Sequence, residues 1–456
     1  MFLLIQNEGE APIEAFTVLG DSGSRHRDGL IGQFGSGNKH GINLLLRLGV
    51  EFYIYSGPNK LEFFPERVVV TEADGRQRDS MRVKCRVSGK INRTIDCGWT
   101  LDFGALDWRE VRMALREFVS NAIDCSTVMG TKPEVKPEPT PRAKSGFTRI
   151  FVSMNNADVV DFYRNLGVHF LHFSPDPGQV GKTFLRKNPE TLGPRVYLEG
   201  VLVNELRATV KSAFDYNFTK GEVRIDECRN SDEYALRARI AQRINKADKD
   251  TLAAFFEAMS KGDVYESTLD DFYLSYSTDE NVKQNWNDAW QTFAGEAVIA
   301  SESLADSKIG EHVAAKGHKV VAVKSKAFVQ TAEKMGVRNV ATVLGNHGAQ
   351  GKIECEATDA AVKAVDTVWS WCEATHMTGG KEKPEVRCFR QLMDGEGETL
   401  GFYTPGSPAV NIREDLAGKI ALKTAIEEVA HYITGSTDCS RDFQNFAFDM
   451  IVELCV

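Results

Sequence analysis

The segment from residue 31 to residue 41 constrains this chain most. It reads Ile-Gly-Gln-Phe-Gly-Ser-Gly-Asn-Lys-His-Gly and leads into an apolar stretch, so the sequence predicts a glycine-rich loop that opens a helix over 38–48. Glycines allow a ligand to approach the backbone closely, and the first turn of a helix carries amide hydrogens that have no partner inside the helix. Such a loop is typical of a phosphate-binding site.

A second segment places three polar residues on one face of a predicted helix. Glu117, Asn121 and Asp124 stand at positions i, i+4 and i+7, which lie on the same side of a helix. Asn121 is unusual because asparagine is a poor residue for a helix interior. Carboxylate and amide oxygens are ligands that Mg²⁺ accepts. The two segments together predict a site that binds phosphates with Mg²⁺.

Both segments resemble motifs of the GHKL ATPase superfamily, which includes gyrase, heat-shock chaperones, MutL and MORC proteins. Residues 117–124 match its Glu-x-x-x-Asn-Ala-x-Asp box, and residues 31–37 resemble its second glycine box. Residues 21–24 (Asp-Ser-Gly-Ser) resemble its Asp-x-Gly-x-Gly box without the last glycine. The glycine boxes precede the helix here, whereas they follow it in the family. The resemblance therefore implies a permuted Bergerat-type ATP-binding sandwich of the α+β class.

The resemblance also implies a role for each matched residue. Glu117 would activate the attacking water, and Asn121 would coordinate Mg²⁺ between the phosphates. Asp21 would accept a hydrogen bond from the adenine amino group. Thr148 corresponds to a nucleotide-contacting threonine in a predicted strand, although it is equally consistent with an ordinary strand residue. The full set of residues expected to contact ATP is Asp21, Gly23, Gly32, Gly35, Gly37, Lys39, Asp124 and Thr148.

The rest of the chain divides into further predicted parts after an ATP-binding domain at 1–155. Residues 156–275 resemble the transducer domain that follows GHKL modules and supplies a phosphate-sensing lysine. Residues 276–345 are predicted to form a small α/β unit, and residues 346–456 a last domain. The candidates for the phosphate-sensing lysine are Lys182, Lys187, Lys211 and Lys220.

Several local predictions accompany this division. Residues 13–20 and 222–226 are predicted strands, and Asp107 is the predicted N-cap of the helix that carries Glu117. The proline-rich stretch 131–145 is expected to form a flexible loop over the site or a disordered excursion. The apolar start, residues 2–5, is expected to form a strand or an arm that exchanges between two protomers.

The last domain carries the sequence Glu427-Glu-Val-Ala-His431 on a predicted helix that follows two predicted strands. This arrangement resembles zincin metallopeptidases, whose helix carries His-Glu-x-x-His. Glu427 replaces the first histidine, while Glu428 keeps the position of the general base. Glu427, His431 and either Asp438 or Asp442 would hold Zn²⁺ weakly, because carboxylates are poorer zinc ligands than imidazoles. We therefore expect a degenerate zincin-like α+β fold without peptidase activity.

Composition narrows the function further. A net charge of −9 argues against a general nucleic-acid binder, although a local basic patch stays open. No apolar run approaches the roughly 18 residues of a membrane span. Nine cysteines occur without a Cys-x-x-Cys pair, which is expected of free thiols in a reducing cytoplasm.

These observations favour a slow, Mg²⁺-dependent ATPase that acts as a chaperone-like or MORC-like machine and pairs as a homodimer when ATP binds. One alternative is a zincin-type metallopeptidase that nucleotide regulates. Another is a protein that binds nucleotide without hydrolysing it and serves as an interaction partner. The sequence does not identify a protein client.

Overall fold

The computed structural model divides the chain into two compact units, Met1–Ile244 with Asp263–Leu269 and Asn245–Gly262 with Asp270–Val456. Both units combine helices with sheets, which confirms the α+β class. The predicted boundaries after residues 155, 275 and 345 remain predictions. The structure describes residues 1–20, 29–32, 35–185, 192–269, 277–392, 399–436 and 440–455.

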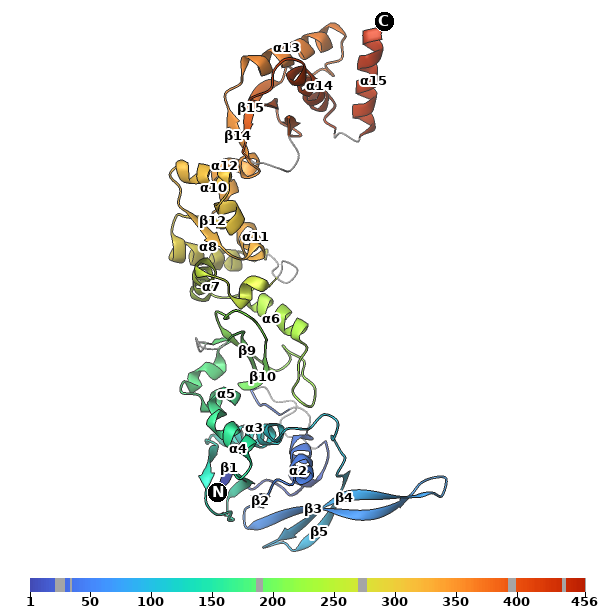
Figure 1. Cartoon of the computed structure of the whole chain (residues 1–456), viewed down its shortest axis with the longest axis vertical. Coiled ribbons are helices and arrows are strands. Elements are labelled where there is room, and N and C mark those ends of the chain that lie inside the picture. Colours follow the sequence, from blue (N-terminus) through green and yellow to red (C-terminus); the bar gives the residue numbers. More distant parts are fainter. Residues whose placement is uncertain are drawn as a thin grey trace. The chain divides into compact units, whose positions relative to one another are not determined.

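A seven-stranded antiparallel sheet forms the base of the first unit (Figure 1). β1 is an inner strand of this sheet, because it pairs with β7 on one side and with β6 on the other. β3 and β4 form a long hairpin that extends past the other strands. In spatial order the strands are β5 (Arg93–Thr100), β4 (Gln77–Ser88), β3 (Asn59–Thr71), β2 (Phe52–Ser56), β7 (Phe147–Ser153), β1 (Phe2–Glu8) and β6 (Glu134–Glu138).

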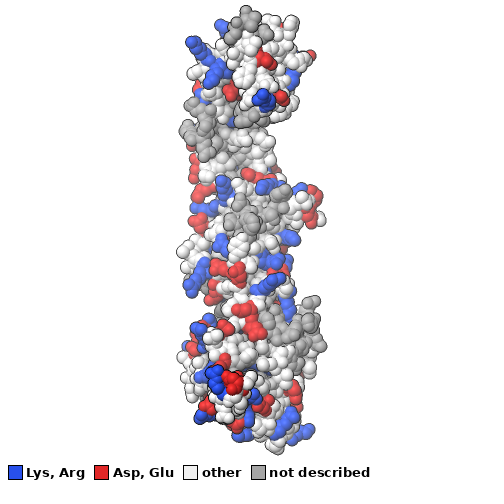
Figure 2. Space-filling view, turned by 90° about the vertical axis from the view of Figure 1, so that its right-hand side faces the viewer, with Lys and Arg blue, Asp and Glu red and all other residues white. Residues whose placement is uncertain are grey.

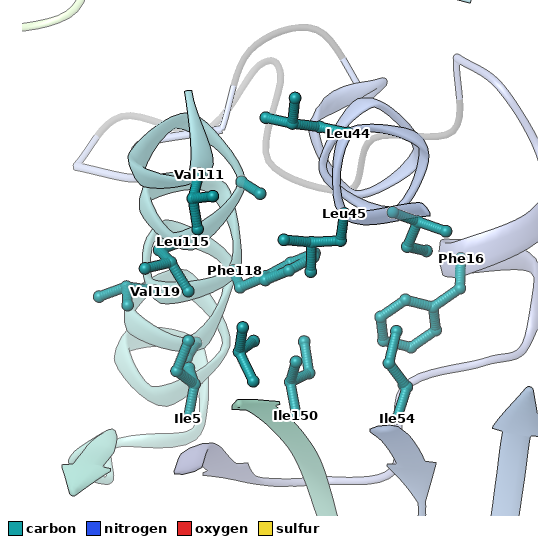
Figure 3. Packing of buried hydrophobic residues seen from close by; sticks show 14 of the residues in the cluster. Ile5, Phe16, Leu44, Leu45, Ile54, Val111, Leu115, Phe118, Val119 and Ile150 are labelled. Carbon is teal, nitrogen blue, oxygen red and sulfur yellow. The ribbon is translucent and has the colours of Figure 1, made fainter. Parts of the chain in front are cut away.

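Two helices, α2 (Gly37–Arg47) and α3 (Val111–Met129), pack on one face of this sheet. Figure 3 shows Leu45 of α2 and Phe118 of α3 above Ile5 and Ile150 of the strands. Full burial of such side chains stabilises the fold by about 1.5–3 kcal/mol each. Gly41 allows the two helices to approach closely, because a Cβ there would lie 3.0 Å from the ring of Phe118.

The remainder of the first unit is a smaller, four-stranded sheet with short helices around it. Two of its strands, β9 and β10, form an antiparallel hairpin around Gly200. The sheet contains, in spatial order, β10 (Val201–Glu205), β9 (Arg195–Leu198), β11 (Asp215–Phe218) and β8 (Phe184–Leu185). The helices of the first unit besides α2 and α3 are α1 (Glu14–Thr17), α4 (Ala157–Arg164), α5 (Leu166–His169) and α6 (Glu233–Asn245).

Among the described residues, the second unit contains two separate sheets. One consists of the parallel strands β12 (Val298–Ser301) and β13 (Val320–Val323). The other has the order β14 (Lys352–Cys355), β15 (Glu385–Gln391), β17 (Ala409–Arg413) and β16 (Gly401–Tyr403). The helices are α7 (Lys249–Lys261), α8 (Glu280–Ala294), α9 (Glu302–Ala305), α10 (Lys308–Ala315), α11 (Lys326–Lys334), α12 (Val340–Ala349), α13 (Asp359–Ala374), α14 (Gly418–Thr434) and α15 (Arg441–Cys455).

Near the start of the chain one prediction is wrong, and for residues 2–5 the strand alternative is confirmed. Residues 13–20 contain the short helix α1 instead of a strand, and its first turn carries Glu14, which favours a helix N-terminus. The N-terminal residues 2–5 belong to β1, whose two edges are both paired, so they do not form a free arm. A strand that is hydrogen-bonded on both sides offers no edge to a partner.

Three further predictions also need correction. The stretch 131–145 contains β6, where Pro137 is tolerated because β6 is the edge strand of its sheet. Residues 222–226 form no strand and contribute only an isolated bridge between Lys220 and Val223. The N-cap of α3 is Glu110 instead of Asp107.

Within the described ranges, no helix has the length and apolar character needed to cross a bilayer. The cysteines whose side chains the structure describes are free thiols. Acidic and basic side chains are interspersed over the face shown in Figure 2.

Candidate functional site

The glycine-rich loop leads into the amino end of α2, as the sequence predicts. Gly35 has a φ of 76°, a left-handed conformation that glycine adopts without strain. Lys39 is buried on the first turn of the helix, and its Nζ donates to the carbonyl of Gly35 at 3.0 Å. The cation of Lys39 therefore lies against the loop at the start of α2.

Glu117 faces the start of α2 from the neighbouring helix α3. A Cβ added to Gly37 would collide with the Glu117 carboxylate, so the glycine is needed for this close approach. Arg229 Nε donates to Glu117 Oε1 at 2.6 Å, and its Nη2 donates to Oε2 at 3.2 Å. Burial alone would raise the pKa of Glu117, but the charge and hydrogen bonds of Arg229 outweigh it, and Arg116 and His40 add to them. The pKa of Glu117 is therefore held below its ordinary value, and the carboxylate is ionised.

Asn121 and Asp124 lie one and two turns further along α3 and contact the glycine-rich region differently. Asn121 Nδ2 donates to Asn38 Oδ1 at 2.8 Å, which joins α3 to the first turn of α2. Asp124 accepts hydrogen bonds from the backbone amides of Ile31 (2.6 Å) and Gly32 (2.8 Å). Both Asp124 oxygens thus hold the loop in place. Asp124 therefore has a structural role, in addition to the contact with ATP that the family resemblance implies.

A small cavity of about 140 Å³ lies beside Asn121. Its wall includes Thr148 of β7, whose hydroxyl donates to the carbonyl of Gly9 at 2.8 Å and accepts from the amide of Ala11 at 2.9 Å. Most other wall residues are apolar. The polar side chains that line the cavity are Asn7, Asn38, Asn121 and Thr148. The sequence pattern did not single out Asn7, because a lone asparagine after an apolar strand carries no periodic signal.

Lys220 is the transducer candidate that reaches the glycine-rich loop. Its Nζ donates to the carbonyls of Leu30 (3.0 Å) and Gly32 (2.7 Å). Lys187 lies outside the described residues, as do two predicted adenine-side residues, Asp21 and Gly23. The second half of the first unit thus supplies a cation to the loop from a position 188 residues away in sequence.

Arg229 contacts the candidate site but was not singled out from the sequence. It belongs to a turn over 226–230 in which the amide of Arg229 donates to the carbonyl of Asp226 at 2.9 Å. The amide of Asn230 donates to Asp226 Oδ1 at 2.7 Å. Arg229 is only 4% exposed although arginine seldom lacks solvent. No spacing rule could have found it, because its partner Glu117 is 112 positions earlier.

The helix with Glu-x-x-His is confirmed as α14, and it packs against the edge strand β16. Gly401 of that strand leaves room for α14, since a Cβ there would lie 2.7 Å from Cγ of Glu428. An open cavity of about 430 Å³ at this place is lined by Glu427, Glu428 and His431. His431 Nδ1 donates to the carbonyl of Ser436 at 2.8 Å, which orients the imidazole ring.

The predicted zinc ligands are only partly brought together. Asp438 lies outside the described residues, and Asp442 is on the separate helix α15. Across the part of the chain that the structure describes, no three His, Cys, Asp or Glu side chains are grouped closely enough to hold a metal ion.

The sequence was compared with protein-family models and with curated protein sequences. No protein-family model matches this chain, and no curated protein sequence matches it.

Proposed function

We propose that the first unit binds ATP with Mg²⁺ and hydrolyses it slowly. The observation that supports this most is the position of Glu117, an ionised carboxylate that faces the amino end of α2 across Gly37. The amino end of a helix favours anions through its amide hydrogens and its dipole. A carboxylate beside a phosphate site has one evident chemical use, which is to accept a proton from an attacking water.

The charges around the loop favour an anionic ligand. Lys39 and Lys220 donate to carbonyls of the loop, and Arg116 and Arg229 lie beside Glu117. These four cations would attract the negative charge of a triphosphate. Asn121 and Asn38 offer amide oxygens, which are hard ligands of the type that fits Mg²⁺. Mg²⁺, when bound, would offset charge on the phosphate oxygens.

The adenine base of ATP would occupy the cavity beside Asn121. Small-molecule sites are mostly apolar with a few polar groups that set orientation, and this cavity has that composition. Thr148 and Asn7 are polar groups that line this cavity and could set the orientation of the adenine. In the proposed reaction a water oxygen bonds to the γ-phosphorus, its proton passes to Glu117, and the bond from that phosphorus to the β-phosphate oxygen breaks.

Calorimetry and phosphate release test this proposal. Glu117→Gln should keep nucleotide binding and lower turnover by about 10²–10⁴-fold, since it removes the base without removing the phosphate site. Asn121→Ala should lose Mg²⁺-dependent binding. Glu110→Gln makes the same charge change at the exposed start of α3 and should leave both unchanged. If wild-type protein binds neither ATP nor ADP at millimolar concentrations, the proposal fails.

The second unit supports a separate, weaker proposal. Glu428 and His431 line a cavity beside an edge strand, so we assign residues from about 346 onward to a zincin-like domain without peptidase activity. Any metal would be held weakly by Glu427, His431 and Asp438. Stoichiometric zinc in untagged protein, with a cleavage activity that Glu428→Gln abolishes, would instead favour the metallopeptidase alternative.

A further inference from the structure

The 226–230 turn contacts both helices of the candidate phosphate site. Glu227 Oε2 lies 3.2 Å from Nε2 of His40 on α2. The carbonyl of Cys228 accepts a hydrogen bond from Arg116 Nη2 at 2.5 Å, and Arg229 binds Glu117. Three successive residues of one turn therefore each contact a different side chain around the site. A connection that only joined β11 to α6 would not need these contacts.

The backbone of Arg229 is held in an unfavourable conformation. Its φ of 61° lies in the left-handed region, which costs free energy for a residue that carries a Cβ. The turn's own hydrogen bonds to Asp226 maintain this conformation. Backbone strain of this type persists where the surrounding structure needs one side chain at one point, and here that side chain is the guanidinium beside Glu117.

Glu117 cannot act efficiently as a base in this arrangement. Both of its oxygens accept hydrogen bonds from the fork of Arg229. On its other side the first turn of α2 is so close that residue 37 has to be glycine. A carboxylate that already accepts a hydrogen bond on each oxygen and whose charged form is stabilised is a weak proton acceptor.

We propose that Arg229 is a positioning residue that withholds Glu117 until a nucleotide phosphate replaces the carboxylate as the partner of its guanidinium. The fork of an arginine fits two oxygens of a phosphate as well as those of a carboxylate. A buried guanidinium needs an anionic partner at all times, because an unpaired buried charge is costly. The exchange therefore conserves one ion pair and frees the base only when substrate is present.

This inference rests on the proposed ATP binding and adds a regulatory step to it. It also explains why the turn comes from the second half of the first unit. Exchange at Arg229 would release one of the three contacts that hold the turn on α2 and α3. Binding of nucleotide would thereby be signalled to the segment between β11 and α6.

A double-mutant cycle on the full-length protein tests the exchange. The affinity for a non-hydrolysable ATP analogue with Mg²⁺ is measured by calorimetry for wild type, Glu117→Gln, Arg229→Gln and the double variant. Glu117→Gln should bind the analogue about tenfold more tightly than wild type, because Arg229 no longer has to leave a charged partner. In the Arg229→Gln background the same change should give a gain at least about threefold smaller. Arg224→Gln, on an exposed residue of the same segment, is the matched control background and should retain the full gain.

Equal gains in both backgrounds would mean that Glu117 repels the phosphates only through its charge, and would overturn the role of Arg229 while ATP binding stands. Absence of binding by wild type would overturn the proposed function and this inference together. A second readout is the pH profile of kcat/KM, which reports the pKa of Glu117 in the free enzyme, where Arg229 is paired with it. Its acid limb should move to higher pH in Arg229→Gln, and Arg229→Lys should move it back because lysine restores the positive charge. An unmoved limb in Arg229→Gln would also contradict the inference.

Discussion

At the scale of single residues, the candidate site is built from buried charges that each have a specific partner. Glu117 is paired with Arg229, and Asp124 is paired with two backbone amides of the loop. Removing one member of a buried ion pair typically costs about 3–5 kcal/mol, because the other charge remains in a poorly solvated place. The first unit therefore depends on these polar contacts for stability as well as for the proposed chemistry.

His40 makes the free energy of unfolding depend on pH. The ring is buried between Phe103, with ring centres 4.1 Å apart, and Trp108, at 4.7 Å. Burial lowers the pKa of His40, although Glu227 and Glu117 act in the opposite direction and Arg47 acts with burial. The unfolded chain then binds this proton more readily than the folded chain does, so stability falls as pH drops below about 6.5.

Urea unfolding of the full chain should therefore show a free energy of unfolding about 1 kcal/mol lower at about pH 5.5 than at about pH 7.5. His40→Gln should reduce this difference. Part of the difference in the free energy of unfolding should remain, because burial also lowers the pKa of His169 and His172. His347→Gln, at an exposed position, serves as the control and should keep the full difference. A free energy that rises toward acid pH in wild type would contradict the prediction.

At the scale of elements, the position of β1 decides how the first unit holds together. β1 lies between β7 and β6, and its Ile5 packs under α2 and α3 (Figure 3). The sheet therefore depends on the first residues of the chain. No local sequence pattern indicates that this strand lies inside the sheet.

Ile5→Ala should lower the free energy of unfolding by about 2–5 kcal/mol, because it leaves a cavity in the core. Glu8→Ala, at the exposed end of the same strand, should change it by less than about 0.5 kcal/mol. Denaturant titrations at two protein concentrations provide the measurement. If the effect of Ile5→Ala depended on concentration, β1 would be exchanged between protomers and its inner position would be wrong.

At the scale of the whole molecule, the resemblance to GHKL machines implies a change of assembly with nucleotide. Such machines pair two protomers when ATP orders the residues around the site. The net charge of −9 and the mixed surface charges do not oppose weak pairing at ordinary ionic strength.

We expect the full chain to form homodimers in the presence of the ATP analogue with Mg²⁺ and monomers without it. Light scattering at concentrations well above micromolar measures this directly. Asn121→Ala is the control, because it should lose Mg²⁺-dependent binding and so stay monomeric under both conditions. If wild-type protein stays monomeric with the analogue bound, the chain is not a machine that dimerises with nucleotide. The proposal would then be reduced to a nucleotide-binding protein.

The sequence by itself determined the elements whose signals are local. The helices that carry Glu117 and His431 and the helix after the glycine-rich loop were predicted from spacings within one or two turns, and the strand of Thr148 from its β-branched and aromatic residues. Such periods reflect the geometry of one helix or strand and need no knowledge of the rest of the chain.

Only the tertiary structure decided which distant residues complete the site. Arg229, Lys220 and Asn7 lie far from the motifs in sequence, and the turn that holds Arg229 is irregular. The strand β6 within a proline-rich stretch depends likewise on pairing with β1. These features share a physical reason. A buried ion pair or a strand ladder is stabilised by a partner that the folded chain brings near, and no spacing along the sequence encodes that partner.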